Sequence, residues 1–272
     1  MKKITLIVAA LFTTTFGFAQ TNGKIKLEKG KKLMMESEVV TSTLISMMGQ
    51  SIENKTNTNS TNKIVVEDVI GDTYKITNTP VKIKMTVEAM GETMEYDSEK
   101  PNATSELSKK LDESLNEPQT MMIDNQGKKI SSKEDNAKKG TEDGEEEVDI
   151  RHAFIPIPEN IKVGDKFEAS DIDKDSNTSS SIKYTVRSID GDIARLTFTG
   201  KIKSEGVTER QGMEVHTNTS GNINGECTVN INSGVIQTLK SKTRMRGNVS
   251  VMEQEMPIEI EITNKISIKE AE

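Results

Sequence analysis

Apolar and polar residues alternate along much of this chain, which is the pattern of β-strands with one buried face. The clearest runs are Val81–Val87, Cys227–Ile231 and Pro257–Ile262. In the first run the period of two places the apolar residues on one face and the lysines on the other. Turn residues recur between such runs, and Val, Ile and Thr are abundant within them. We therefore predict a mainly β protein of antiparallel curved sheets, with one face in water.

Leucines spaced four residues apart interrupt this alternation at one place. Leu107, Leu111 and Leu115 share one side of a helix, and a proline stands beyond each end of the run. The spacing predicts one short amphipathic helix near residues 103–116, laid against the sheet.

A weak internal similarity indicates two related halves. Residues 63–77 read KIVVEDVIGDTYKIT and residues 183–197 read KYTVRSIDGDIARLT, with the Gly-Asp turn at the same place. A duplication explains the match, although hairpins with the same turn residues also resemble one another without common origin.

Because the strands are long and tryptophan is absent, we predict open half-barrels in preference to a compact sandwich.

The charged segment 131–150 is poor in apolar residues and is predicted to be a linker. It separates an N-terminal β half, residues 20–130, from a C-terminal β half, residues 151–272.

The first residues have the features of a secretory signal peptide. Lys2 and Lys3 precede an apolar run, and small residues lead to a predicted cleavage site after Ala19. The run is too short to span a bilayer, and no later segment is comparably apolar, so no transmembrane segment is predicted. No cysteine stands near the cleavage site for lipid attachment. We expect residues 1–19 to be removed and the protein to be soluble in the periplasm or outside the cell.

Composition narrows the range of partners. The formal net charge is −7, which argues against nucleic acid as a partner. Aromatic residues make up 3% of the chain, whereas 14 methionines are present, so methionine is expected to fill part of the core.

Residues that could carry catalysis are sparse. The chain has two histidines and one cysteine, without the spacing of a zinc site or of a serine nucleophile motif. Cys227 alternates in phase with Val229, which predicts a buried strand position. The aspartates at 171, 173 and 175 begin like a calcium loop, but Ser176 stands where glycine is needed. We therefore predict no catalytic residues, no metal site and no cofactor.

Several short motifs resemble an uncharacterised family of exported Bacteroidota proteins, known only as a domain of unknown function. They are the segment Phe18–Gln20, Met/Gly/Gln hairpin tips such as Met47–Gln50, the segment Val163–Phe167, and the C-terminal strands from Gly225 onward. The resemblance spans most of the chain after the signal peptide. It implies no activity and no site residues.

The sequence thus predicts an exported, non-enzymatic binding or envelope-associated protein whose partner is an unknown protein or an apolar ligand. The alternative is a periplasmic carrier of an apolar ligand such as a lipid. In that alternative, Leu107, Leu111 and Leu115 of the predicted helix line the ligand site. A hydrolase built on an acidic pair is a third alternative.

Overall fold

The computed structural model describes residues 23–47, 50–89, 91–100, 106–130, 150–173, 178–210, 213–251 and 254–271. The predicted signal peptide 1–19 and all of the predicted linker 131–150 except its last residue lie outside these ranges. Among the described residues, no helix is both long and apolar enough to cross a bilayer.

One antiparallel sheet of eleven strands forms most of the molecule. Its strands are β1 (Lys32–Met47), β2 (Gln50–Ile70), β3 (Thr73–Ala89), β4 (Glu92–Asp97), β5 (Gln119–Asp124), β6 (Lys166–Asp173), β7 (Thr178–Asp190), β8 (Ile193–Arg210), β9 (Met213–Asn230), β10 (Ile236–Val251) and β11 (Gln254–Glu270). The helical elements are α1 (Glu106–Ser114) and a short 3-10 turn (Ile150–Ala153).

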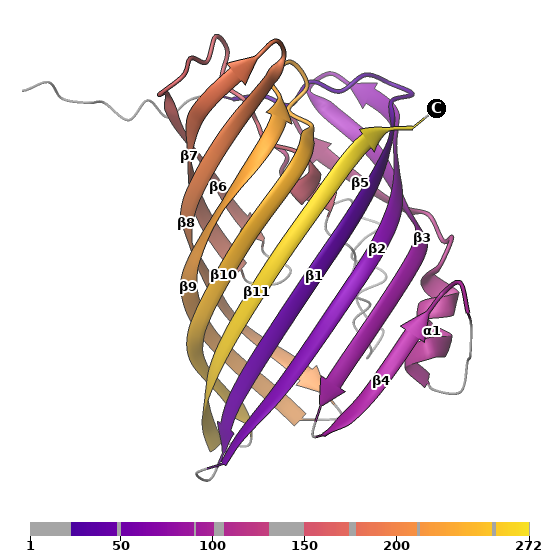
Figure 1. Cartoon of the computed structure of the whole chain (residues 1–272), viewed down its shortest axis with the longest axis vertical. Helices are drawn as coiled ribbons and strands as arrows, with labels where there is room; N and C mark the ends of the chain where they lie inside the picture. The colour runs from indigo at the N-terminus through magenta and orange to yellow at the C-terminus, as the bar shows by residue number, and fades with distance from the viewer. Residues whose placement is uncertain are drawn as a thin grey trace, which may run out of the picture.

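The strand order is β4-β3-β2-β1-β11-β10-β9-β8-β7-β6, and β5 pairs with the other part of β3. The first and last long strands, β1 and β11, are neighbours, with Leu33 opposite Glu270 and Ile45 opposite Ile258. This pairing joins the strands on either side of residues 131–149 into one continuous, curved and open sheet (Figure 1). The predicted fold class, mainly antiparallel β with an open sheet and one short helix, is confirmed.

The hydrophobic core fills one end of this sheet. It lies around the turns β2–β3 and β7–β8, at the top of Figure 1. Ile64, Ile76, Leu196 and Val229 are fully buried there, and strand alternation places them all on one side of the sheet. We call this side the inner face. Two segments outside the sheet complete the core, through Ile25 and Leu27 and through residues 153–157.

The two hairpins with similar sequence also share backbone details. Strand β2 has a bulge between Val66 and Asp68, and β7 has one between Val186 and Ser188, at the same offset of 120 residues. Each bulge directly follows a valine, Val66 or Val186. The backbone of that valine is hydrogen-bonded to the residues just before the start of another strand. A bulge leaves a residue unpaired and bends its strand, so two bulges at one offset are a specific structural match.

The two valines make the same pattern of backbone hydrogen bonds. Val66 accepts a hydrogen bond from the N–H of Gly30 at 2.8 Å and donates to Lys31 at 2.9 Å. Val186 accepts from Gly164 at 2.9 Å and donates to Asp165 at 2.9 Å. The two glycines have positive φ, 82° and 93°. The sequence similarity therefore coincides with a repeated structural unit of strand, bulge and glycine turn.

Candidate functional site

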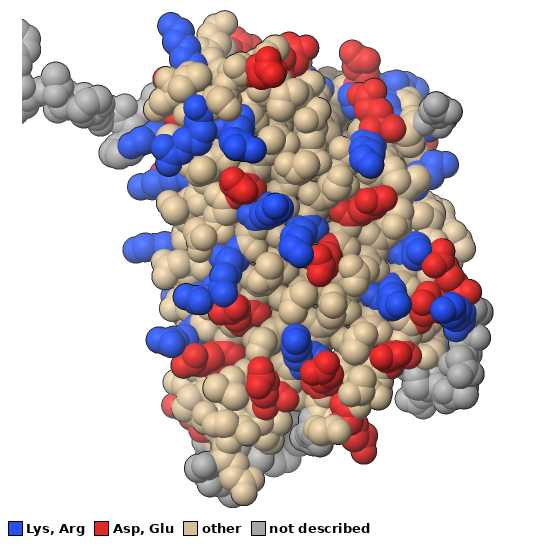
Figure 2. All heavy atoms as spheres, viewed as in Figure 1, with Lys and Arg blue, Asp and Glu red and all other residues tan. Residues whose placement is uncertain are grey.

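The two faces of the sheet differ in charge. Figure 2 shows lysine, arginine, aspartate and glutamate spread over the outer face of the strands around β1 and β11. At the inward positions of β1–β3 and β7–β11, one of the side chains that the structure describes is charged. It is Glu270, the exposed last residue of β11, and it lies 2.7 Å from Lys31. Uncharged residues at these positions keep the inner face compatible with apolar material.

Below the core, the inner face continues as a wall of half-buried apolar and hydroxyl side chains. We call this the inner wall, and define its apolar part as Val39, Ile45, Ile52, Met85, Val87, Ile223, Val249, Ile260 and Ile262. They come from strands on both sides of the β1–β11 pair, and the registers place them on the inner face. Threonines such as Thr41, Thr43 and Thr56 stand between them. A partly exposed apolar surface spread over this many strands is typical of a binding surface.

Outward side chains balance one another through cross-strand ion pairs. Lys265 lies 2.8 Å from Glu38, and Arg244 lies 2.9 Å from Glu261. These groups are largely exposed, so each pair stabilises the fold only slightly. Their main consequence is an outer face that is compatible with water.

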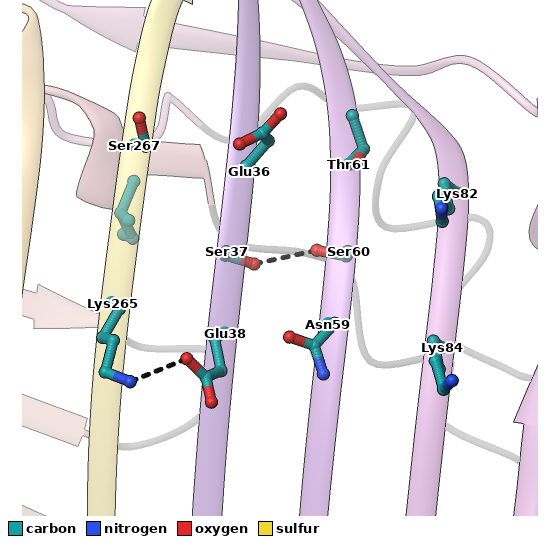
Figure 3. A pocket seen from close by; sticks show the side chains of 11 residues that line it. Glu36, Ser37, Glu38, Asn59, Ser60, Thr61, Lys82, Lys84, Lys265 and Ser267 are labelled. Carbon is teal, nitrogen blue, oxygen red and sulfur yellow. Dashed lines mark hydrogen bonds and ion pairs between the residues drawn. The ribbon is translucent and has the colours of Figure 1, made fainter.

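A shallow hollow of about 460 Å³ lies across β11, β1, β2 and β3 (Figure 3). Its lysines are each paired with an acid: Lys265 with Glu38, Lys82 with Glu99 at 2.6 Å, and Lys84 with Asp97 at 3.7 Å. Because these charges are already neutralised, the hollow has no excess positive charge to attract an anion. We assign it no ligand.

The predicted helix lies at the edge of the sheet beside β4 (Figure 1). The hydroxyl of Tyr96 donates to Oδ1 of Asp112 at 2.6 Å, and the N–H of Asn116 donates to the carbonyl of Pro80 at 2.7 Å. Leu111 and Leu115 are half-buried. The side chain of Leu107 lies outside the described part of the chain, as do residues 103–105 of the predicted helix. The ligand contacts of the three leucines stay a prediction.

Cys227 is buried as its alternation predicts, with 2% of its surface exposed. Burial, and then the charge of Glu226, raises the pKa of its thiol to about 12. The thiol is therefore neutral near pH 7 and is a poor nucleophile. Nearby in the core, the rings of Phe167 and Tyr184 stack with centroids 5.1 Å apart. Burial raises the pKa of Tyr184 well above its ordinary value.

Metal binding has no support in the part of the chain that the structure describes. No group of three or more His, Cys, Asp or Glu side chains comes together there. The side chains of residues 171–177, which include the incomplete calcium loop, lie outside that part.

Sequence reasoning missed a set of buried amides on the inner face. Asn62 and Asn78 are fully buried, and both carry polar atoms without a hydrogen-bond partner, as does Gln119. The signal was an asparagine at an inward position of an alternating run, for example Asn78 in phase with Tyr74 and Ile76.

Comparison with known proteins gives a family of unknown function and a few likenesses in fold. Residues 134–236, less than half of the chain, match DUF6263, a family of unknown function. The predicted resemblance to an uncharacterised family is confirmed in that coarse form, while a Bacteroidota source and export stay predictions. No curated protein matches the chain.

The chain also has a low similarity to several solved structures. A lipovitellin structure concerned with lipid–protein interactions has 10% identity and a TM-score of 0.47, over 91% of this chain and 26% of that one. This chain therefore spans about a quarter of lipovitellin's length. An outer membrane channel from Pseudomonas putida F1 has 6% identity and a TM-score of 0.26, over 90% of this chain and 98% of that one. A DUF1329 family protein from Desulfovibrio piger has 10% identity and a TM-score of 0.13, over 89% of this chain and 85% of that one. All three TM-scores lie below 0.5, so these similarities carry no argument about fold or function.

Proposed function

We propose that this chain is an exported, non-enzymatic binding protein that holds an apolar ligand against the inner wall. The observation that carries the proposal is the contrast between the two faces of one sheet. Apart from Glu270 at the end of β11, the described inward side chains of β1–β3 and β7–β11 are uncharged, whereas the outer face carries paired charges. Export rests on the signal peptide expected at residues 1–19.

The inner wall fits an apolar ligand better than a polar one. Isoleucines at 260 and 262 are half-buried, so each still presents apolar surface that a ligand would remove from water. Burying such surface stabilises a complex by roughly 25 cal/mol per Å² before the costs of association. A charged ligand would lose its hydration without meeting an opposite charge in the inner wall.

Native mass spectrometry of protein purified from its own source gives the first test. We expect a reproducible bound mass that organic extraction removes. Protein of bare sequence mass, combined with no uptake of an added apolar probe, would contradict the proposal.

Decylpyrene is a suitable added probe, because it is apolar throughout and fluoresces more strongly out of water. The decisive variant is Thr43→Lys, which places a charge on the inner wall between Asn54 and Ile260. The matched control is Ser42→Lys, which places the same charge on the outer face beside Glu261. We expect Thr43→Lys to weaken decylpyrene binding about tenfold or more, and Ser42→Lys to leave it unchanged.

A partner protein is the other occupant that the sequence left open. It would bind an exposed patch or sheet edge and would not require the inner wall. Equal probe binding by Thr43→Lys and Ser42→Lys would favour that alternative.

A further inference from the structure

Three amide side chains on neighbouring strands keep polar atoms without partners. These atoms are Oδ1 of Asn62, Oδ1 and Nδ2 of Asn78, and Oε1 of Gln119. Asn62 and Asn78 have no exposed surface, and Gln119 is half-buried. Buried polar groups are nearly always hydrogen-bonded, so four such atoms in one region need an explanation.

The strand registers bring the three amides together. Asn78 on β3 is directly opposite Gln119 on β5, and on its other side it is opposite Ile64 on β2. Asn62 lies two residues from Ile64, on the same face and diagonal to Asn78. On one face of a sheet, opposite residues have Cβ atoms about 5 Å apart and diagonal residues lie about 7 to 8 Å apart, so the three amides are close neighbours. We call these three residues the amide cluster.

The amide cluster stands where the core ends and the inner wall begins. Ile64 and Ile76 of the core lie on one side of it. On the other side of the cluster, strand β2 continues along the inner face through Ser60 and Thr58, which are half-buried. The Nδ2 group of Asn62 donates to Oγ of Ser60 at 3.0 Å, so the cluster is linked to the first polar position of the wall.

The hydrogen-bonding type of the four unpaired amide atoms determines which ligand group could bond to them. One is a donor, Nδ2 of Asn78, and three are acceptors. A matching group must therefore both donate and accept hydrogen bonds. A bare carboxylate or phosphate only accepts, and it would meet three oxygens without a cation among the described inward side chains of these strands. A hydroxyl or a primary amide fits.

We infer that the amide cluster binds the polar head of the apolar ligand, and that this head is uncharged and carries both a hydrogen-bond donor and an acceptor. The inference rests on the proposed function, because the rest of the ligand lies along the inner wall. The ligand class is thus a long apolar chain with a hydroxyl or amide head, as in a fatty alcohol or a fatty amide.

Three pyrene probes with the same chain test the inference. Decylpyrene has no polar head, pyrene-labelled decanol has a hydroxyl, and pyrene-labelled decanoate has a carboxylate that is ionised at neutral pH. For the unchanged protein we expect the decanol to bind about tenfold more tightly than decylpyrene, which corresponds to one or two well-made hydrogen bonds. The decanoate is expected to bind more weakly than the decanol.

Two variants locate the effect. Asn78→Leu removes the central amide, and Gln119→Met removes the half-buried amide with little change of shape. The second variant still tests the inference if the first fails to fold. In both, we expect the preference for decanol over decylpyrene to fall below about twofold, with decylpyrene binding retained. Asn59→Leu, on the exposed outer face of β2, is the control and should keep the full preference.

The outcomes separate the two proposals. Equal binding of decanol and decylpyrene by the unchanged protein would overturn the inference and leave the proposed function standing. It is also the result expected if ordered water alone satisfies the cluster. Loss of the preference in Asn59→Leu as well would overturn the assignment to the amide cluster. Failure of all three probes to bind would overturn the proposed function itself.

Discussion

The hydroxyl of Tyr96 donates a hydrogen bond to Oδ1 of Asp112 at 2.6 Å, and this contact joins edge strand β4 to helix α1. Tyr96 is on the inner face, opposite Met85 of β3, and only 4% of its surface is exposed. The helix is therefore held to the sheet from the inner side of its edge. Asp112 directly follows Leu111 in the helix, so this contact helps to hold Leu111 in place.

Removing this hydroxyl should loosen the helix. In Tyr96→Phe the ring still fills its place, but Asp112 loses its donor, so we expect a loss of about 1.5 kcal/mol in the free energy of unfolding. Amide hydrogen exchange in residues 109–114 should quicken. Unchanged exchange there would show that other contacts hold the helix.

The same residue predicts a response to alkaline pH. Burial, followed by the hydrogen bond to Asp112 and the nearby carboxylates, raises the pKa of Tyr96 from 10.0 to about 12. The unfolded chain loses this proton first, so the stabilisation is complete below pH 10 or so and is lost as the pH rises towards about 12. Urea unfolding at about pH 8 and about pH 11 should show a smaller alkaline loss in Tyr96→Phe than in the unchanged protein. Equal losses would contradict the assignment.

The repeated glycine turn predicts matched effects in the two related units. Gly30 and Gly164 have positive φ, and an added Cβ would meet nothing within 4 Å at either place. Backbone strain is then the only cost, and we expect Gly30→Ala and Gly164→Ala each to destabilise the fold by about 1 to 2 kcal/mol. Chemical denaturation measures both. A large effect at one position and none at the other would show that the units are not equivalent.

Gly225 is required for a different reason. It is opposite Phe198 on the inner face, and an added Cβ would collide with the carbonyl of Lys240 and come within 3.0 Å of the Phe198 ring. We expect Gly225→Ala to displace Phe198 and to destabilise the protein by about 2 kcal/mol or more. Asn224→Ala on the outer face is the control. Similar melting temperatures for the two variants would rule out this packing.

The buried thiol offers a probe of unfolding. Because the pKa of Cys227 is raised to about 12 and its surface is buried, a thiol reagent at neutral pH should react about a hundredfold faster in urea than with the folded protein. Mass spectrometry of the labelled chain measures the rate. Rapid labelling of the folded protein would mean that β9 opens locally.

Local pattern was sufficient for the elements themselves. Alternation predicted the strand containing Ile83 and Met85, and the leucines at 107, 111 and 115 predicted a helix near 103–116, of which the structure describes Glu106–Ser114. Both patterns follow from the geometry of one chain segment, with a period of two in strands and about four in helices. The Gly-Asp turns at Gly71 and Gly191 were likewise predicted from neighbouring residues alone.

Tertiary structure decided which strands pair and what lies on the shared face. Leu33 of β1 pairs with Glu270 of β11, more than two hundred positions away in the sequence, and no local pattern specifies this pairing. The grouping of Asn62, Asn78 and Gln119 depends in the same way on the register of three strands. The sequence by itself determined the strands, the helix and the alternation of charged and uncharged faces, because neighbouring residues set these. The single curved sheet, its uncharged inner wall and the amide cluster needed the folded chain, because strand order and register bring distant residues together.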